Sequence, residues 1–513
     1  MDIHSNIKQL SLQKNLPEQI AEQSFELDYL LADYLPDIFK ILKCEVTPTV
    51  TSVLVGEGKV TCDLSMELRV LYLAEQTHDV CVICQKQEQQ KTVDISNLMP
   101  DSNVSVSVRP DQCRCRVVNP RRIDLRGTVL LKLEPEGQET VSYLSGEGKD
   151  TTMQYKTERM ECLAGKKTVC RQMTVVETSP LPYGKPPIET VLLYRTTPML
   201  KEVKRVQDKV VCKGNIRLHL LYLPKAEEGE SKQMQTAEFL SPVDAIVNLD
   251  APADAKLQVS FDVITTELTA QNDISEAALE GQYHLNLCVD CYDVGEMAYV
   301  SDLYSTASEV EKQTKMLNCL SLQQMVDETC ICKNLLTVPG GISQVLDLLC
   351  DIRGTSLRTT AEGNAVFTVN LQLDLFALDE NGMPFCAERL IPCEFTPDVA
   401  VSNGEAVFSP KLGIVSESYR ITESGELEVR CELQMRGAFC RKQKITAVTG
   451  VTKDDAHPYE RGAACVYLYY AKAGEDAWEI AKRFCADHAM MMEENELNAS
   501  VLSSDRMLLI PSV

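Results

Sequence analysis

Two cysteine pairs have the spacing of a zinc or redox motif. They are Cys81–Cys84 and Cys288–Cys291, and thiols at this spacing bind metal or exchange disulfides when a tight turn brings them together. The flanking residues are strand formers, however, and side chains three positions apart on a strand point to opposite faces. We therefore expect all four to be small buried packing residues that bind no metal.

Other residues that could carry chemistry lack the context that their reactions need. The segments 56–59 and 146–149 both read Gly-Glu-Gly-Lys, but a phosphate loop has Ser or Thr after the lysine, and here Val60 and Asp150 follow. The six histidines are scattered, and no hydrolase nucleophile motif is present. We expect no catalytic residue, metal or cofactor, and an enzyme of unknown class remains the third alternative.

Trp478 is the only tryptophan of the chain. It lies at the border of an apolar helical stripe, and Lys482, four residues later, shares its helical face. Two interpretations are open. The ring either completes the core of a small module or remains half-exposed as an aromatic anchor for a partner.

A compact unit is predicted around Trp478. The apolar strand 466–470 is followed by the turn 472–476 and then by the stripe Ala477, Ile480, Ala481 and Phe484, which has helical spacing. A second helical stretch covers 488–494, and an apolar strand, 507–511, ends the unit. The predicted order is strand, helix, helix, strand.

The rest of the chain contains one β-rich unit three times. Apolar residues alternate with polar ones over 60–72, and the pattern returns over 210–222 and 365–377. A second pattern, over 123–131, recurs at 277–285 and 427–435. An anchor covers 38–48 and 188–198, with a weaker third copy over 342–349, and one short helix is predicted near it. The predicted fold is mainly β: three repeated β-sandwich-like domains plus a small α+β module.

The repeats give the expected boundaries. These are 1–150, 151–308 and 309–452 for the three domains, 453–464 for a linker and 465–513 for the module, with a charged loop over 224–236 in the second repeat.

The charge and composition of the chain argue against some classes of binding partner. A formal charge of −24 argues against nucleic acid and against an anionic membrane surface. No signal peptide and no run of eighteen apolar residues is visible, so a cytosolic location is expected, in which the twenty-one cysteines are mostly thiols. Cys62 and Cys212 occupy equivalent strand positions and are expected to be buried.

The anchor at 35–42 (Leu-Pro-Asp-Ile-Phe-Lys-Ile-Leu) and the strand ends Leu71-Tyr72-Leu73 and Leu221-Tyr222-Leu223 resemble those of SPOCS-domain spore-coat proteins of endospore formers. The C-terminal unit resembles a LysM module. The resemblance implies a non-enzymatic scaffold of coat assembly in the mother-cell cytosol, at the forespore surface. Its implied partner is a coat morphogenetic ATPase of the SpoIVA type, and self-association of the repeats is a further expectation.

LysM modules bind glycan polymers or proteins, and two turns bear on that choice. Glycan-binding members usually have Gly-Asp-Thr-Leu after the first strand, where this chain has Gly-Glu-Asp-Ala at 474–477, and Ser-Asp-Arg at 504–506 replaces the usual small turn. We expect a protein ligand, with binding to peptidoglycan or cortex glycan as the alternative. The expected partner-binding residues are Gly474, Glu475, Asp476, Trp478, Lys482, Asn495 and Leu497.

Overall fold

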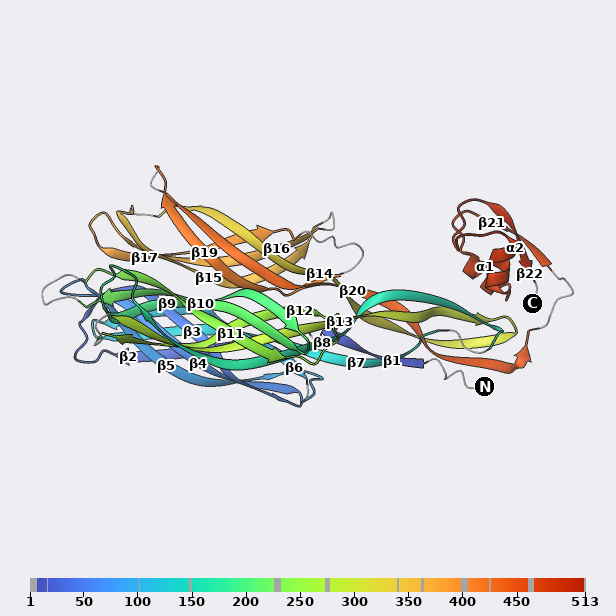
Figure 1. Ribbon diagram of the computed structural model, residues 1–513, viewed down its shortest axis with the longest axis horizontal. Coiled ribbons are helices and arrows are strands. Elements are labelled where there is room, and N and C mark those ends of the chain that lie inside the picture. Colours follow the sequence, from blue (N-terminus) through green and yellow to red (C-terminus); the bar gives the residue numbers. More distant parts are fainter. Residues whose placement is uncertain are drawn as a thin grey trace.

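The computed structural model describes residues 7–15, 17–100, 102–146, 150–225, 232–272, 277–338, 341–360, 364–397, 405–423, 426–459 and 466–511. Parts of three predicted features lie outside these ranges: the turn at 146–149, the charged loop at 224–236 and the linker at 453–464. Antiparallel strands dominate the rest, and the two α-helices of the described chain lie in the C-terminal module (Figure 1).

The first copy consists of two sheets, in the strand orders β3-β4-β5 and β1-β7-β2, with β6 also paired to β7. Its strands are β1 (Ile7–Asn15), β2 (Gln19–Leu30), β3 (Ile38–Gly56), β4 (Lys59–Ala74), β5 (Val80–Asp94), β6 (Asn103–Asn119) and β7 (Arg122–Leu144).

The second copy repeats this plan with the sheets β9-β10-β11 and β8-β13-β12. Its strands are β8 (Met153–Pro180), β9 (Ile188–Val206), β10 (Lys209–Pro224), β11 (Gln235–Asn248), β12 (Lys256–Gln271) and β13 (Ala278–Ser305).

The third copy has the sheets β15-β16-β17 and β14-β20-β18, with β19 also paired to β20. Its strands are β14 (Ser308–Leu336), β15 (Gln344–Thr359), β16 (Ala365–Leu378), β17 (Pro384–Phe395), β18 (Glu405–Phe408), β19 (Lys411–Ile421) and β20 (Leu427–Pro458). The long strands predicted over 60–72, 210–222 and 365–377 are thus β4, β10 and β16, each at the centre of its sheet.

Alternating side chains of the central strands form the core of each copy. Cys62, Leu64 and Met66 on β4 are at most 1% exposed and pack against Ile123 and Leu125 of the facing sheet. This is the expected consequence of a strand with one apolar face. Cys62 and Cys212 are both buried free thiols, which confirms that prediction.

The short helix expected near each anchor is wrong: the anchors form strands, β3 and β9, and the described residues beside them contain no helix. Pro48 lies opposite Met66, and Pro198 lies opposite Ile216. Both strands are at the edge of their sheets, and an edge strand tolerates proline because one of its sides forms no ladder.

The three copies are joined through the ends of their central strands. Leu71, Leu221 and Phe376 occupy equivalent positions, point out of their own sandwiches and meet in one buried cluster with Leu192 and Leu349. This second burial explains why alternation gives way to Leu-Tyr-Leu: Tyr72 packs in the first core while its two neighbours pack against the other copies.

Beyond the sandwiches, strands continue as paired ribbons that form a narrower stalk (Figure 1). The pairs are β1 with β7, β8 with β13 and β14 with β20. Their apolar side chains form another shared cluster, which includes Tyr143, Met297 and Leu317. Strand β20 continues to Pro458, opposite Ser308, and so extends into the segment predicted as a linker.

The cysteines depart from the expectation in three respects. Cys288 is bonded to Cys170, which lies directly opposite it on β8, whereas Cys291 is a buried free thiol. The two thiols of this pair diverge as predicted, but the expectation of a reduced packing residue is wrong for Cys288. A second disulfide joins Cys332 to Cys393. Cys84 is exposed rather than buried, because it lies on the uncovered side of β5.

No helix in the described part of the chain is both long enough and apolar enough to span a membrane.

Candidate functional site

The C-terminal module has the predicted order of elements. They are β21 (Val466–Ala471), α1 (Ala477–Arg483), α2 (His488–Glu494) and β22 (Arg506–Pro511), and the two strands pair antiparallel. Ala477, Ile480 and Ala481 are at most 1% exposed, and the Phe484 ring packs edge-on against Tyr469, with 5.6 Å between ring centroids. The predicted apolar stripe is confirmed.

Aspartates begin both helices. Asp476 accepts a hydrogen bond from the backbone N–H of Trp478 (2.9 Å), and Asp487 accepts one from that of Met490 (2.9 Å). Such caps satisfy N–H groups that have no partner within the helix. Gly474, in the turn before α1, has φ of 90°, a conformation that glycine adopts without strain.

Trp478 is buried by the same chain. Its side chain is 3% exposed, its Nε1 donates to Asp302 Oδ2 (2.9 Å), and its ring meets that of Tyr304 edge-on at 5.0 Å. The interpretation as a half-exposed anchor is therefore wrong, and the core interpretation is correct. The cause lies far away in the sequence: β13 extends beyond its sandwich, and its end covers the ring.

Asp302 is the centre of this contact. Its carboxylate receives hydrogen bonds from Trp478, from Lys482 Nζ (2.6 Å) and from Lys312. Burial alone would raise the pKa of this carboxyl group, but the two ammonium groups and the indole N–H outweigh burial and lower the pKa to about 2. Asp302 is therefore ionised at neutral pH and holds α1 on the ribbon.

Both helix caps also contact the ribbon of β8 and β13. Lys156 Nζ lies 3.0 Å from Asp476 Oδ2, and Gln154 donates to Asp487 Oδ2 at 3.1 Å. The Tyr304 hydroxyl donates to the backbone carbonyl of Ala486 at 2.8 Å. The module is seated on the stalk through both helix caps, through Trp478 and Lys482 of α1 and through the backbone of Ala486.

The other expected partner-binding residues lie elsewhere. Glu475 accepts hydrogen bonds within its own turn, from the Tyr469 hydroxyl (3.0 Å) and the Lys472 N–H (2.8 Å). Asn495 is 5% exposed and joins α2 to β22 through two hydrogen bonds with the backbone of Leu509, and Leu497 packs against the module core.

The seven expected residues therefore do not form one surface. Asp476, Trp478 and Lys482 face the ribbon, Gly474 and Glu475 form a turn, and Asn495 and Leu497 stabilise the module. Sequence reasoning missed Asp302, Tyr304, Lys156 and Gln154, which look like ordinary strand residues and carry no local signal.

The outer face of the module's sheet is apolar and exposed. Leu468 lies opposite Leu509, and Tyr470 lies opposite Met507. Together with Val466, these residues are 42% to 67% exposed, whereas Leu508 and Ile510 on the inner face are fully buried. We call Val466, Leu468, Tyr470, Met507 and Leu509 the outer sheet face.

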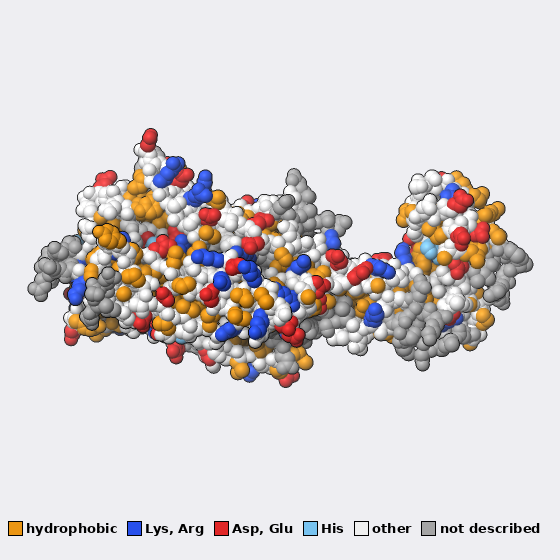
Figure 2. Space-filling model, viewed as in Figure 1, with side chains coloured by type: hydrophobic (Ala, Val, Ile, Leu, Met, Phe, Trp, Pro, Cys, Tyr) orange, Lys and Arg blue, Asp and Glu red, His pale blue; other side chains and the backbone are white. Residues whose placement is uncertain are grey.

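A sequence signal for this face existed. The run Val466–Tyr470 is continuously apolar, and a strand with only one covered face should alternate. In Figure 2, hydrophobic side chains lie along the edges of the module, and on the body Lys and Arg are interspersed with Asp and Glu rather than gathered by sign.

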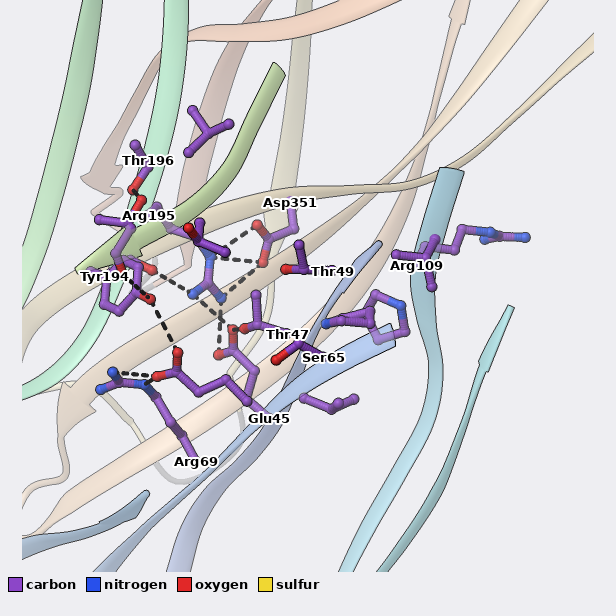
Figure 3. Close-up of a pocket in the computed structure, with 18 of the residues that line it drawn as sticks. Glu45, Thr47, Thr49, Ser65, Arg69, Arg109, Tyr194, Arg195, Thr196 and Asp351 are labelled. Atoms are coloured by element: carbon purple, nitrogen blue, oxygen red, sulfur yellow. Dashed lines mark hydrogen bonds and ion pairs between the residues drawn. The ribbon is translucent and has the colours of Figure 1, made fainter. Parts of the chain in front are cut away.

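A polar cavity of about 370 Å³ lies where the three copies meet (Figure 3). Arg195 projects from β9 between Glu45 of the first copy and Asp351 of the third, at 2.9 Å from each. Beside it, the Tyr194 hydroxyl donates to Glu67, which also pairs with Arg69.

The charged residues around the cavity join the three copies, and we call them the joint. The Arg195 side chain is 17% exposed and pairs with carboxylates from two other copies. Lys43 of β3 similarly pairs with Asp374 of β16, at 2.7 Å. Charges that pair in this way tie each copy to the other two.

Two segments of the chain match the family model of the SipL SPOCS domain, residues 37–118 and 187–271. The chain contains SPOCS domains. The first match covers β3 to β5 and nearly all of β6, and the second covers β9 to β12, the equivalent strands of the second copy. Both SPOCS matches lie outside the C-terminal module. No curated protein matches the chain.

Replacing Arg195 with Ala should destabilise the protein by about 3 kcal/mol, because it leaves carboxylates of two other copies without their cation. Urea unfolding monitored by circular dichroism measures this. Arg358→Ala is the matched control, since its ion pair with Glu394 is more than half exposed and should contribute less than about 1 kcal/mol. Equal losses in the two variants would contradict the joint.

The contact at Asp302 can be followed by the fluorescence of Trp478, because this is the only tryptophan of the chain. Asp302→Asn should shift the emission to longer wavelength as water reaches the ring. Asp262→Asn, which removes an exposed partner of Lys411, should leave the emission unchanged. An unshifted spectrum in Asp302→Asn would show that the carboxylate does not hold the module.

The stabilisation by Asp302 should depend on pH, and comparing wild type with Asp302→Asn measures it. The pKa of Asp302 is about 2 in the folded state and near 3.9 in an unfolded chain. Its stabilisation is therefore fully present above about pH 5 and is lost as the pH falls towards 2. The difference in urea midpoint between wild type and Asp302→Asn, followed by Trp478 emission, should be constant from pH 7 to 5 and shrink below pH 4.

Proposed function

We propose that the chain is a non-enzymatic assembly scaffold of the spore coat. In this proposal the three sandwiches form a rigid frame, and the LysM-like C-terminal module docks a protein partner. The SPOCS-domain match supports the role in the coat. The partner that the resemblance implies is a coat morphogenetic ATPase of the SpoIVA type at the forespore surface.

The observation that carries the docking role is the outer sheet face. Its five large apolar side chains are at least 42% exposed, although a two-stranded sheet gains much of its stability from covered faces. Contiguous exposed apolar surface is typical of protein interaction sites. A partner that covers this face would remove apolar surface from water without breaking any contact within the module.

The docking proposal therefore moves from the face of Trp478 to the opposite side of the module core. Trp478 and Lys482 are occupied by Asp302, so a partner at that face would first have to displace the ribbon. Among the residues that the structure describes, none covers the outer sheet face in this way, since its five side chains are at least 42% exposed. Leu468 and Tyr470, the two most exposed side chains of this face, are the expected anchors.

The test is recovery of the purified SpoIVA-type ATPase by the full-length chain and its variants. Leu468→Glu and Tyr470→Glu should each weaken binding at least tenfold, because each places a charge in an apolar contact. Leu390→Glu, on β17, is the matched control with a leucine that is 59% exposed, and it should bind as wild type. Unchanged Trp478 emission in every variant shows that the module remains seated.

Two results would contradict the proposal. One is full recovery of the ATPase by Leu468→Glu and Tyr470→Glu. The other is pelleting of the chain with purified peptidoglycan that is lost in Glu475→Gln and retained in the outer-face variants. The second result would assign the module to the glycan alternative.

A further inference from the structure

The first copy contains three cysteines whose side chains converge between its two sheets. Cys44 lies on β3, and Cys113 and Cys115 lie two residues apart on β6, facing the same core. The Sγ atoms of Cys44 and Cys113 are 3.0 Å apart. A disulfide bond is about 2.05 Å long, so these sulfurs are close to bonding distance.

The third copy shows that this fold accepts a bond between its sheets. Its disulfide joins Cys332 on β14 to Cys393 on β17, and these strands belong to opposite sheets. Cys350 and Cys431 form a further pair between opposite sheets there, with Sγ atoms 3.6 Å apart, but both are buried.

The three cysteines of the first copy differ from that pair in their access to solvent. All three are only partly buried, so a small oxidant can reach them. The hydrogen bond with Cys44 lowers the pKa of the Cys115 thiol, against the opposing effect of burial. The thiolate is the species that attacks disulfides.

We propose that Cys44, Cys113 and Cys115 form a redox-active thiol site, at which a small disulfide such as oxidised glutathione drives formation of a Cys44–Cys113 bond. Cys115 is the thiol that begins the reaction and is returned at its end. The proposal rests on the distances within the cluster and does not depend on the function proposed for the module.

The reaction is a sequence of thiol–disulfide exchanges. The Cys115 thiolate attacks oxidised glutathione, which forms a mixed disulfide and releases one glutathione thiolate. Cys44 attacks the Cys115 sulfur and releases the second glutathione. Cys113 then attacks Cys44, forms the final bond and frees Cys115. Two protein thiols lose two electrons and two protons, and one oxidised glutathione becomes two glutathione thiols.

The bond would act on the joint between the copies. Cys44 stands between Lys43 and Glu45, which pair with Asp374 and Arg195 of the other copies. Joining Cys44 to β6 would fix the strand that carries both joint residues to the second sheet of its own sandwich. Oxidation would therefore stiffen the place at which the three copies are held together.

The test is differential alkylation and peptide mass spectrometry of the full-length chain, incubated natively with oxidised glutathione or with dithiothreitol. Trypsin cuts after Lys43 and after Arg114, so Cys44, Cys113 and Cys115 fall on three different peptides. We expect a linked Cys44–Cys113 peptide in most oxidised molecules and none after reduction. A higher thermal midpoint of the oxidised protein should accompany the bond.

Variants separate the roles. In Cys115→Ser the same bond should form at least tenfold more slowly, and in Cys44→Ser no linked peptide from this cluster should appear. Cys62→Ser, a buried thiol of the same core, should behave as wild type. Absence of the Cys44–Cys113 peptide from oxidised wild-type protein that elutes as a folded species would overturn the proposal, whatever the variants do. An unchanged rate in Cys115→Ser would overturn the role of Cys115.

Discussion

The structure depends on burying the central strand of each sandwich twice. One face of β4, β10 and β16 forms the core of its own copy. Near the end of each strand, one residue on the other face (Leu71, Leu221 or Phe376) packs against the remaining copies. An apolar side chain of this size stabilises by roughly 1.5–3 kcal/mol when fully buried. Because all three copies contribute, none can leave the cluster without exposing the other two.

The ion pairs beside this apolar cluster determine how the three copies are oriented relative to one another. Arg195 is held between carboxylates of two other copies, and Lys43 reaches a third carboxylate, Asp374. Ion pairs of this kind contribute less net stability than apolar packing but penalise wrong arrangements, because a misplaced copy leaves charges unpaired in a region of low dielectric. Packing thus drives the association, and the charges select one arrangement.

The sequence predicts those features of the structure that are determined by residues close together along the chain. The period-two pattern of residues 60–72 is a local signal, and it correctly gives the strand, its buried face and its two equivalents. The order of elements in the module is equally local. The short helix expected near each anchor failed because the apolar spacing at 38–48 and 188–198 suits a helix or a strand, and pairing with β4 and β10 makes both segments strands.

Contacts between distant segments were beyond the sequence. Glu45 and Arg195 follow the polar phase of their strands and look like solvent-facing residues, since nothing local marks a second interface. The position of Trp478 depends on Asp302, which lies 176 residues away. The outer sheet face could have been predicted, because an unbroken apolar run on a strand indicates that both faces of the strand are apolar.

Fusing three copies into one chain frees equivalent positions from being identical. A symmetric trimer would place the same residue three times at each such position, whereas here one set of equivalents reads Arg69, His219 and Asp374. The fusion also leaves a single C-terminal module, seated on the ribbon of the second copy. The molecule consequently has a front and a back, and it presents one C-terminal module for every three sandwiches.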